Sequence, residues 1–97
     1  MSVKDYIIEV FGTENAVKLA ICESGLKPYA YNPEVYAKSM GITEYSSCGV
    51  FQHNDSRCED KASELYDPYY SVDLAKEKYD KRGWNPWTNC AKRLGLL

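Results

Sequence analysis

Residues 14–25, ENAVKLAICESG, have the apolar spacing of an α-helix with one charged side chain on the apolar side. With an advance of about 100° per residue, Glu23 falls inside the arc formed by Ala16, Val17 and their apolar neighbours. Burial and the negative end of the helix dipole both raise the pKa of a carboxyl group placed there. A raised pKa is what a general acid needs near neutral pH, so Glu23 is a candidate catalytic residue. The structural alternative is that Glu23 extends into solvent at the helix end or pairs with Lys27 at i+4.

Glycine, proline and asparagine divide the rest of the chain into further short helical segments. The spacing predicts helices over residues 3–11 and 14–24, ended by Gly12 and Gly25, with Thr13 as a cap. Further helices are predicted from Asn32-Pro33 to Gly41, from Ser71 to Gly83, and from Asn85-Pro86 through Leu94. Residues 42–60 lack this spacing and are predicted to be an irregular loop or a minimal β-hairpin. The fold class is therefore mainly α, and we expect the functional site in the loop-rich stretch.

Length and composition exclude several classes of protein. The chain has 97 residues, of which 44% are hydrophobic, which predicts a single domain spanning residues 1–97. A net charge of −2, with acidic and basic residues interspersed, argues against a nucleic-acid-binding protein. No apolar run approaches the ~20 residues of a membrane span, and the first residues lack the apolar segment of a secretory signal.

The four cysteines are the expected source of extra stability for so small a core. Cys22, Cys48, Cys58 and Cys90 allow three complete pairings, and no pair has the C-x-x-C spacing. We favour two disulfides, which would place the protein outside the reducing cytosol. The alternatives are free thiols or a zinc site, which would need three or four scattered cysteines because His53 is the only histidine. We expect no metal and no cofactor.

Three short motifs follow one another along the chain: ESG at residues 23–25, GVFQ at 49–52 and WNPW at 84–87. In this order and spacing they resemble the lysozyme-like superfamily, in which peptidoglycan-cleaving lysozymes, lytic transglycosylases and resuscitation-promoting factors share a small α-rich fold. The resemblance runs from about Tyr6 to Cys90. It implies a cleft lined by the loop-rich segment, and cleavage of the β-1,4 bond between N-acetylmuramic acid and N-acetylglucosamine.

The resemblance also implies roles for individual residues. Glu23 matches the catalytic acid that protonates the glycosidic oxygen. Gln52 matches a glutamine that faces the cleft, and Ser47 matches a position beside the scissile bond. Trp84 matches an aromatic residue that packs near the acid. Tyr31 is one of several tyrosines close to the expected cleft in sequence, where an aromatic face can stack on a sugar.

A disulfide pairing is implied in the same way. Cys22 and Cys90 resemble the pair of the resuscitation-promoting factors, with one cysteine just before ESG and the other after a late Trp-Pro. Cys48 and Cys58 would then pair by default and brace the loop that carries Gln52.

The chain departs from the family at the second carboxylate. Ser47 occupies the place where animal-type lysozymes carry it, so no nucleophile is evident. Asp55 is the best remaining residue to activate a water, and Glu44 and Asp60 are weaker ones. His53 is expected to be an exposed loop histidine. Hydrolysis and transglycosylation both stay open, with a preference for chemistry that uses a single acid.

The expected function is therefore peptidoglycan glycan-strand cleavage by an extracytoplasmic monomer of bacterial or phage origin. Two alternatives belong to other classes. One is a peptidoglycan- or chitin-binding module that keeps the scaffold without turnover. The other is a disulfide-stabilised structural module, for instance in a phage particle.

Overall fold

A computed structural model describes residues 1–33, 35–37 and 42–97 of the chain. Its described part is mainly helical, as predicted. The α-helices are α1 (Val3–Phe11), α2 (Asn15–Ser24), α3 (Ala62–Leu65), α4 (Pro68–Arg82) and α5 (Thr88–Arg93). Two 3₁₀ turns, η2 (Cys58–Lys61) and η3 (Asn85–Trp87), precede α3 and α5. The strands are β1 (Tyr31–Asn32), β2 (Val35–Ala37), β3 (Ile42–Glu44) and β4 (Ser47–Cys48).

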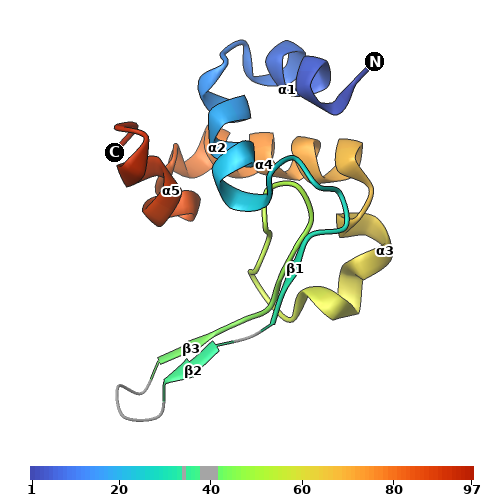
Figure 1. The fold of residues 1–97 in the computed structure, drawn as a ribbon, viewed down its shortest axis with the longest axis vertical. Helices are drawn as coiled ribbons and strands as arrows, with labels where there is room; N and C mark the ends of the chain where they lie inside the picture. The colour runs from blue at the N-terminus through green and yellow to red at the C-terminus, as the bar shows by residue number, and fades with distance from the viewer. Residues whose placement is uncertain (34, 38–41) are drawn as a thin grey trace.

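Helix α4 lies in the middle of the helical body, with α1 packed along it and α5 beside α2 (Figure 1). The core forms where these helices meet the loop after β4. Its largest fully buried side chains are Phe51, Ile7, Leu19, Val50 and Val72. Burying such side chains is worth about 1.5–3 kcal/mol each, which makes this cluster the main source of stability besides the disulfides.

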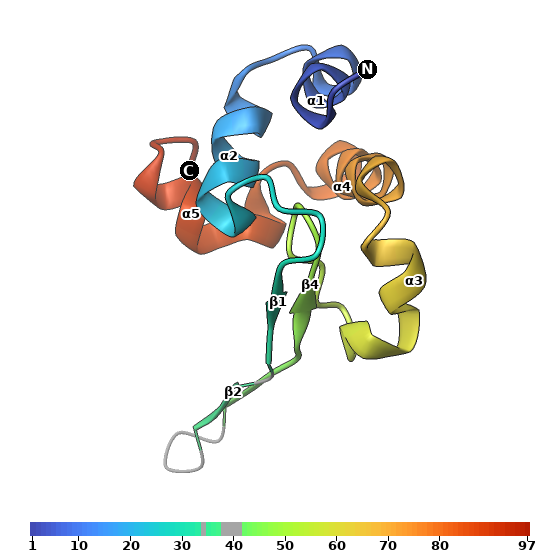
Figure 2. The same cartoon turned by 45° about the vertical axis from the view of Figure 1, so that its right-hand side comes forward.

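The strands form one long antiparallel hairpin that extends away from the helices (Figure 2). Next to the body β1 pairs with β4, with Asn32 opposite Ser47, and further out β2 pairs with β3. The helix predicted from Asn32-Pro33 is therefore wrong where the structure describes it; Gly41 lies outside the described residues. Proline has no N–H to give to a ladder, and the pairing is interrupted at Pro33, between the two ladders.

The start of α4 also differs from the prediction. The helix begins at Pro68, three residues before Ser71, and the Asp67 side chain accepts from the N–H groups of Tyr69 and Tyr70. Asp67-Pro68 is an N-cap followed by proline at the first helical position, which is a common helix start. Ser71 is instead buried in the first turn. Within the described ranges, no helix is long and apolar enough to cross a membrane.

Both disulfides have the pairing that the resemblance implied, Cys22–Cys90 and Cys48–Cys58. The first joins α2 to α5, and the second joins β4 to η2. No cysteine is left free, so neither a zinc site nor reactive thiols remain as alternatives. Two disulfides in a small domain are compatible with an extracytoplasmic protein.

Among the glycines that the structure describes, Gly49, which follows β4, is the one where a side chain is least tolerated. Its φ is +88°, and a Cβ atom there would lie 2.3 Å from the carbonyl oxygen of Leu65. We expect Gly49→Ala to lower the free energy of unfolding by about 2–4 kcal/mol, from strain and overpacking together. Gly12→Ala is the matched control, because Gly12 has φ +72° and no atom within 4 Å of the added Cβ. Its expected cost is about 1 kcal/mol. Equal losses for the two variants in urea unfolding would contradict this account.

Candidate active site

Glu23 lies in the last turn of α2, which ends where Gly25 adopts a left-handed conformation. Its side chain is partly buried, and burial raises its pKa to about 6, although the positive charge of Arg93 acts in the opposite direction. No cation among the described residues lies within ion-pair distance of the Glu23 carboxylate, Lys27 included. The alternative in which Lys27 neutralises Glu23 is therefore not observed. A carboxyl group with a pKa near 6 holds a proton at mildly acidic pH and can donate it.

Ser24 connects the end of α2 to the loop that carries Gln52. This loop, residues 48–53, is called the cleft loop below. The Ser24 hydroxyl donates to the carbonyl oxygen of Val50 over 2.6 Å, and its oxygen also lies 3.2 Å from the carbonyl oxygen of Ala20. The residue next to Glu23 is thus fixed to the cleft loop, which sets the position of the carboxyl group relative to that loop.

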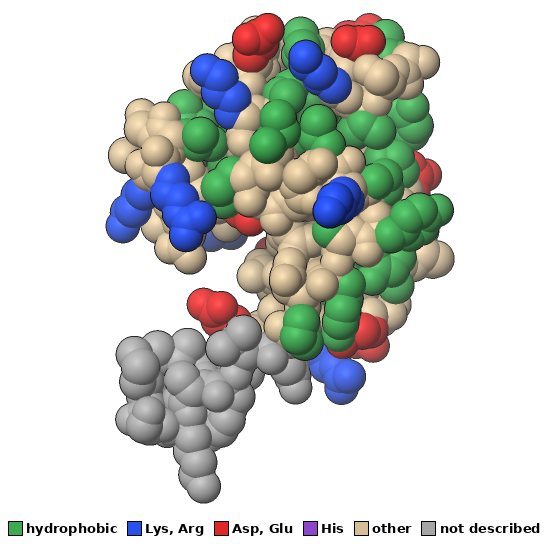
Figure 3. All heavy atoms as spheres, in the orientation of Figure 1, with side chains coloured by type: hydrophobic (Ala, Val, Ile, Leu, Met, Phe, Trp, Pro, Cys, Tyr) green, Lys and Arg blue, Asp and Glu red, His purple; other side chains and the backbone are tan. Residues whose placement is uncertain are grey.

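The Glu23 side chain lines a cavity of about 610 Å³, which is large enough for a ligand of several rings. In Figure 3 a hollow opens beside α5, with acidic side chains facing it. The lining combines carboxylate, amide, hydroxyl and aromatic groups: Glu23, Asn32, Glu44, Tyr45, Ser47, Gln52, Asn54, Pro86, Trp87, Thr88 and Asn89. The structure therefore brings together Glu23, Ser47 and Gln52, which the sequence placed in one site.

The Gln52 side chain lines the cavity, but its amide is used within the protein. Its Nε2 donates to the carbonyl oxygens of Gly49 (2.9 Å) and Ala30 (3.2 Å), and its Oε1 accepts from Asn32 Nδ2 (2.5 Å). These bonds hold the Asn32 side chain at the cavity wall. Sequence reasoning missed Asn32, although its place opposite Ser47 follows once the hairpin register is known.

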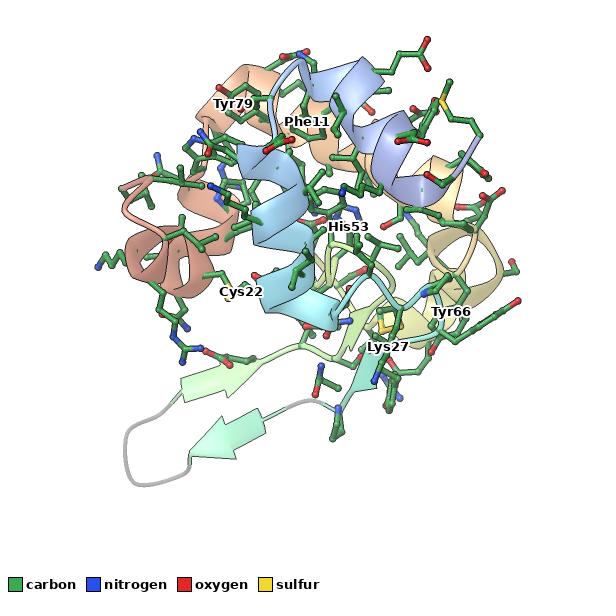
Figure 4. The ribbon with its side chains drawn as sticks, turned by 45° about the horizontal axis from the view of Figure 1, so that its top comes forward. Phe11, Cys22, Lys27, His53, Tyr66 and Tyr79 are labelled. Atoms are coloured by element: carbon green, nitrogen blue, oxygen red, sulfur yellow. A yellow bond between two sulfur atoms is a disulfide. The ribbon has the colours of Figure 1, made fainter. Side chains whose placement is uncertain are left out.

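The resemblance implied that Trp84 packs near the acid, but the structure places Trp87, and not Trp84, at the cavity. Trp84 packs against Tyr79 and Phe11, with ring centroids 4.5 and 6.3 Å apart, and is not among the residues that line the cavity. Figure 4 shows Phe11 and Tyr79 together on the side of the body that α1 and α4 form. These aromatic contacts leave Trp84 partly buried, outside the cavity that Glu23 lines. Trp87 lines the cavity instead, with its ring N–H donating to the carbonyl oxygen of Phe51 over 3.0 Å.

Two other candidates lie outside the cavity. The Tyr31 hydroxyl donates to Glu59 over 2.8 Å, so this tyrosine braces β1 against η2. Asp55 forms an ion pair with Lys78 of α4. Burial raises the pKa of Asp55, but the contacts with Lys78 outweigh burial and lower this pKa, and Asp55 does not line the cavity with Glu23. Proximity in sequence predicts both residues at the cleft. The turn after Gln52 instead directs Asp55 toward α4.

Of the two remaining acidic candidates, only one lines the cavity. Asp60 is exposed in η2 and does not line the cavity, whereas Glu44 of β3 does. The sequence favours Asp55 over Glu44, and the structure reverses that order, because the hairpin carries Glu44 to the cavity. Tyr45, also near the cleft in sequence, lines the cavity beside it.

His53 is buried, with 2% of its surface exposed, so the expectation of an exposed loop histidine is wrong. Among the described residues, no group of three or more His, Cys, Asp and Glu side chains is arranged to hold a metal ion.

Comparison of the chain with protein-family models, with curated proteins and with solved structures gave no match. The resemblance to the lysozyme-like superfamily therefore stays a prediction from the motifs.

Proposed function

We propose that this protein cleaves the glycan strands of peptidoglycan, on a lysozyme-like fold, with Glu23 as the general acid. The observation that carries the proposal is the position of Glu23. It is a partly buried carboxyl group with a pKa raised to about 6, at the wall of a cavity lined by amides and hydroxyls. Protonated at mildly acidic pH, Glu23 can give its proton to a glycosidic oxygen and assist departure of the leaving sugar.

The lining supports a carbohydrate as the ligand. Asn32, Asn54 and Asn89 offer amide groups, and Ser47 and Thr88 offer hydroxyls, which match the hydroxyl and N-acetyl groups of aminosugars. Trp87 and Tyr45 add aromatic surface. The choice of peptidoglycan rests on the ESG, GVFQ and WNPW motifs and their resemblance to the superfamily.

Two routes complete the reaction after the bond to the leaving sugar breaks. In the first, the ionised Glu23 takes a proton from the substrate's own 6-hydroxyl, whose oxygen bonds to the anomeric carbon and closes a 1,6-anhydro ring. In the second, a water adds to that carbon and loses its proton to a carboxylate. Ser47 in place of a second carboxylate favours the first route. Glu44, the other carboxylate at the cavity, is the base that the second route would use.

Digestion of purified peptidoglycan sacculi tests the proposal. We expect soluble muropeptides, and their mass spectra identify the route: 1,6-anhydromuramic ends mark transglycosylation, and reducing ends mark hydrolysis. Sacculi that retain the protein without releasing products would contradict the proposal in favour of a binding module. If the protein neither binds the sacculi nor releases products, the result would support a structural module.

A further inference from the structure

His53 is a buried titratable side chain that glycan cleavage by Glu23 does not use, yet it follows Gln52 directly in the chain. Figure 4 shows it in the interior of the molecule, surrounded by side chains. A buried polar group costs free energy unless it has hydrogen-bond partners, so the contacts of the imidazole ring indicate what holds it there.

Both ring nitrogens have a partner, and the partners determine where the proton lies. Nε2 is 2.9 Å from the carbonyl oxygen of Ser71, which can only accept, so the Nε2–H group donates. Nδ1 is 2.9 Å from Nζ of Lys78, whose ammonium group can only donate, so Nδ1 accepts. The site therefore fits the neutral imidazole with its proton on Nε2. A second proton, on Nδ1, would face the Lys78 ammonium with no acceptor.

The surrounding charges also oppose a positive imidazole. Burial, and after it the charge of Lys78, lower the pKa of His53 to about 4. Asp55 acts in the opposite direction, but it is paired with Lys78. The titratable groups around His53 and its neighbour Asp55 come from α4, η2 and the loop itself: Lys78, Arg82, Tyr70, Lys61 and Asp55.

His53 closes the cleft loop at its far end. Its backbone pairs with Cys48 in both directions, with N···O distances of 3.1 and 3.2 Å. Gln52, immediately before it, has φ +53°, a conformation that is unfavourable for any residue except glycine. Such a conformation persists only where its surroundings hold it. The Gln52 amide in turn orients Asn32 at the cavity wall.

We propose that His53 is a positioning residue for the cleft: held between Ser71 and Lys78 as a neutral imidazole, it fixes Gln52 and, through Gln52, Asn32. Protonation removes the contact with Lys78 and releases the end of the cleft loop. The effect on catalysis rests on the proposed function, whereas the positioning itself can be measured without a substrate.

The consequence for activity is a lower pH boundary that does not come from a carboxylate. Glu23 must be protonated to act as an acid, so activity falls as pH rises through about 6. His53 must be neutral, so activity also falls as pH drops through about 4. The contribution of His53 to the free energy of unfolding also falls as pH drops. The unfolded chain takes up a proton near pH 6.5 and the folded one only near 4, so the contribution of His53 is lost as pH falls between these values.

Because His53 is the only histidine, its NMR signals are unambiguous, and a pH titration tests the proposal. We expect the Nε2–H tautomer, a midpoint near pH 4, and side-chain amide signals of Gln52 and Asn32 that shift with the same midpoint. His53→Gln keeps a donor toward Ser71 without titrating, so the two amide signals should lose this transition. Lys78→Met should raise the midpoint of His53. Lys76→Met, on the same helix with its partner Asp80, is the control and should leave the midpoint unchanged.

The proposal would be overturned by a His53 midpoint near the ordinary 6.5. It would also be overturned if the amide signals of Gln52 and Asn32 do not shift as His53 titrates. If His53→Gln does not fold, Lys78→Met still decides it. In sacculus digestion, His53→Gln should lose the fall in activity near pH 4. His53→Leu, which lacks both hydrogen bonds, should lose about 10- to 100-fold in kcat from misplacement of the cleft groups. If the wild-type protein digests no glycan while the NMR results hold, the proposed function fails and this inference stands.

Discussion

Glu23→Gln is expected to reduce the rate of glycan cleavage by about 10²–10⁴-fold, the usual contribution of a general acid. Glutamine has nearly the same shape but has no carboxyl proton to give to the glycosidic oxygen. Release of soluble muropeptides from sacculi at pH 5 measures the effect. Glu14→Gln, an exposed acid at the opposite end of α2, is the control and should cleave at the wild-type rate. Wild-type cleavage by Glu23→Gln would exclude Glu23 as the acid.

The same variant should be more stable than the wild type at neutral pH. Burial raises the pKa of Glu23 from 4.5 to about 6, so the folded protein binds this proton more tightly than the unfolded chain does. The wild type therefore loses stability as pH rises from about 4.5 to 6, because ionisation is harder in the folded state. Glutamine never ionises, so the Tm difference in favour of Glu23→Gln should grow over this range and vanish near pH 4. Lower activity together with higher stability distinguishes a lost catalytic group from a damaged fold.

Removing the Cys22–Cys90 disulfide should lower the free energy of unfolding more than removing Cys48–Cys58 does. The bond closes a loop of 68 residues, and the chain-entropy relation gives about 4 kcal/mol for a loop of that size. Cys48–Cys58, which closes a loop of 10, should contribute somewhat under 3 kcal/mol. The double variants Cys22→Ser/Cys90→Ser and Cys48→Ser/Cys58→Ser, compared in urea unfolding, measure both contributions.

The two disulfides should also differ in their effect on catalysis. Cys22 precedes Glu23, and Cys90 follows Thr88 and Asn89 at the cavity wall, so this bond holds the acid-bearing helix against the opposite side of the cavity. Its loss should lower kcat even at temperatures where the variant stays folded. Reductant should do the same to the wild type. Full activity of the Cys22→Ser/Cys90→Ser variant in its folded range would contradict a role for this bond in the cleft.

Much of the helical body could be predicted, because its signals are local. The apolar spacing of residues 14–24, with Gly25 as the stop, predicted α2 and placed Glu23 on the partly buried side. Apolar spacing and caps involve residues within about four positions of each other, and so does the position of a side chain on a helix. Asn32-Pro33 has a helix-start pattern of the same kind, but the pairing of β1 with β4 and of β2 with β3 overrides it.

The contacts that complete the site join residues 20 to 36 positions apart: Asn32 with Gln52, His53 with Lys78, and Trp87 with Phe51. No periodicity or cap connects residues so distant. Their meeting depends on how α4, η3 and the hairpin pack around the cleft loop, which is also why Trp84 and Asp55 lie elsewhere. The local sequence signals thus account for most of the helical body and for the placement of Glu23 on α2. Only the tertiary structure decided which side chains surround that carboxyl group, because packing between elements is a property of the whole fold.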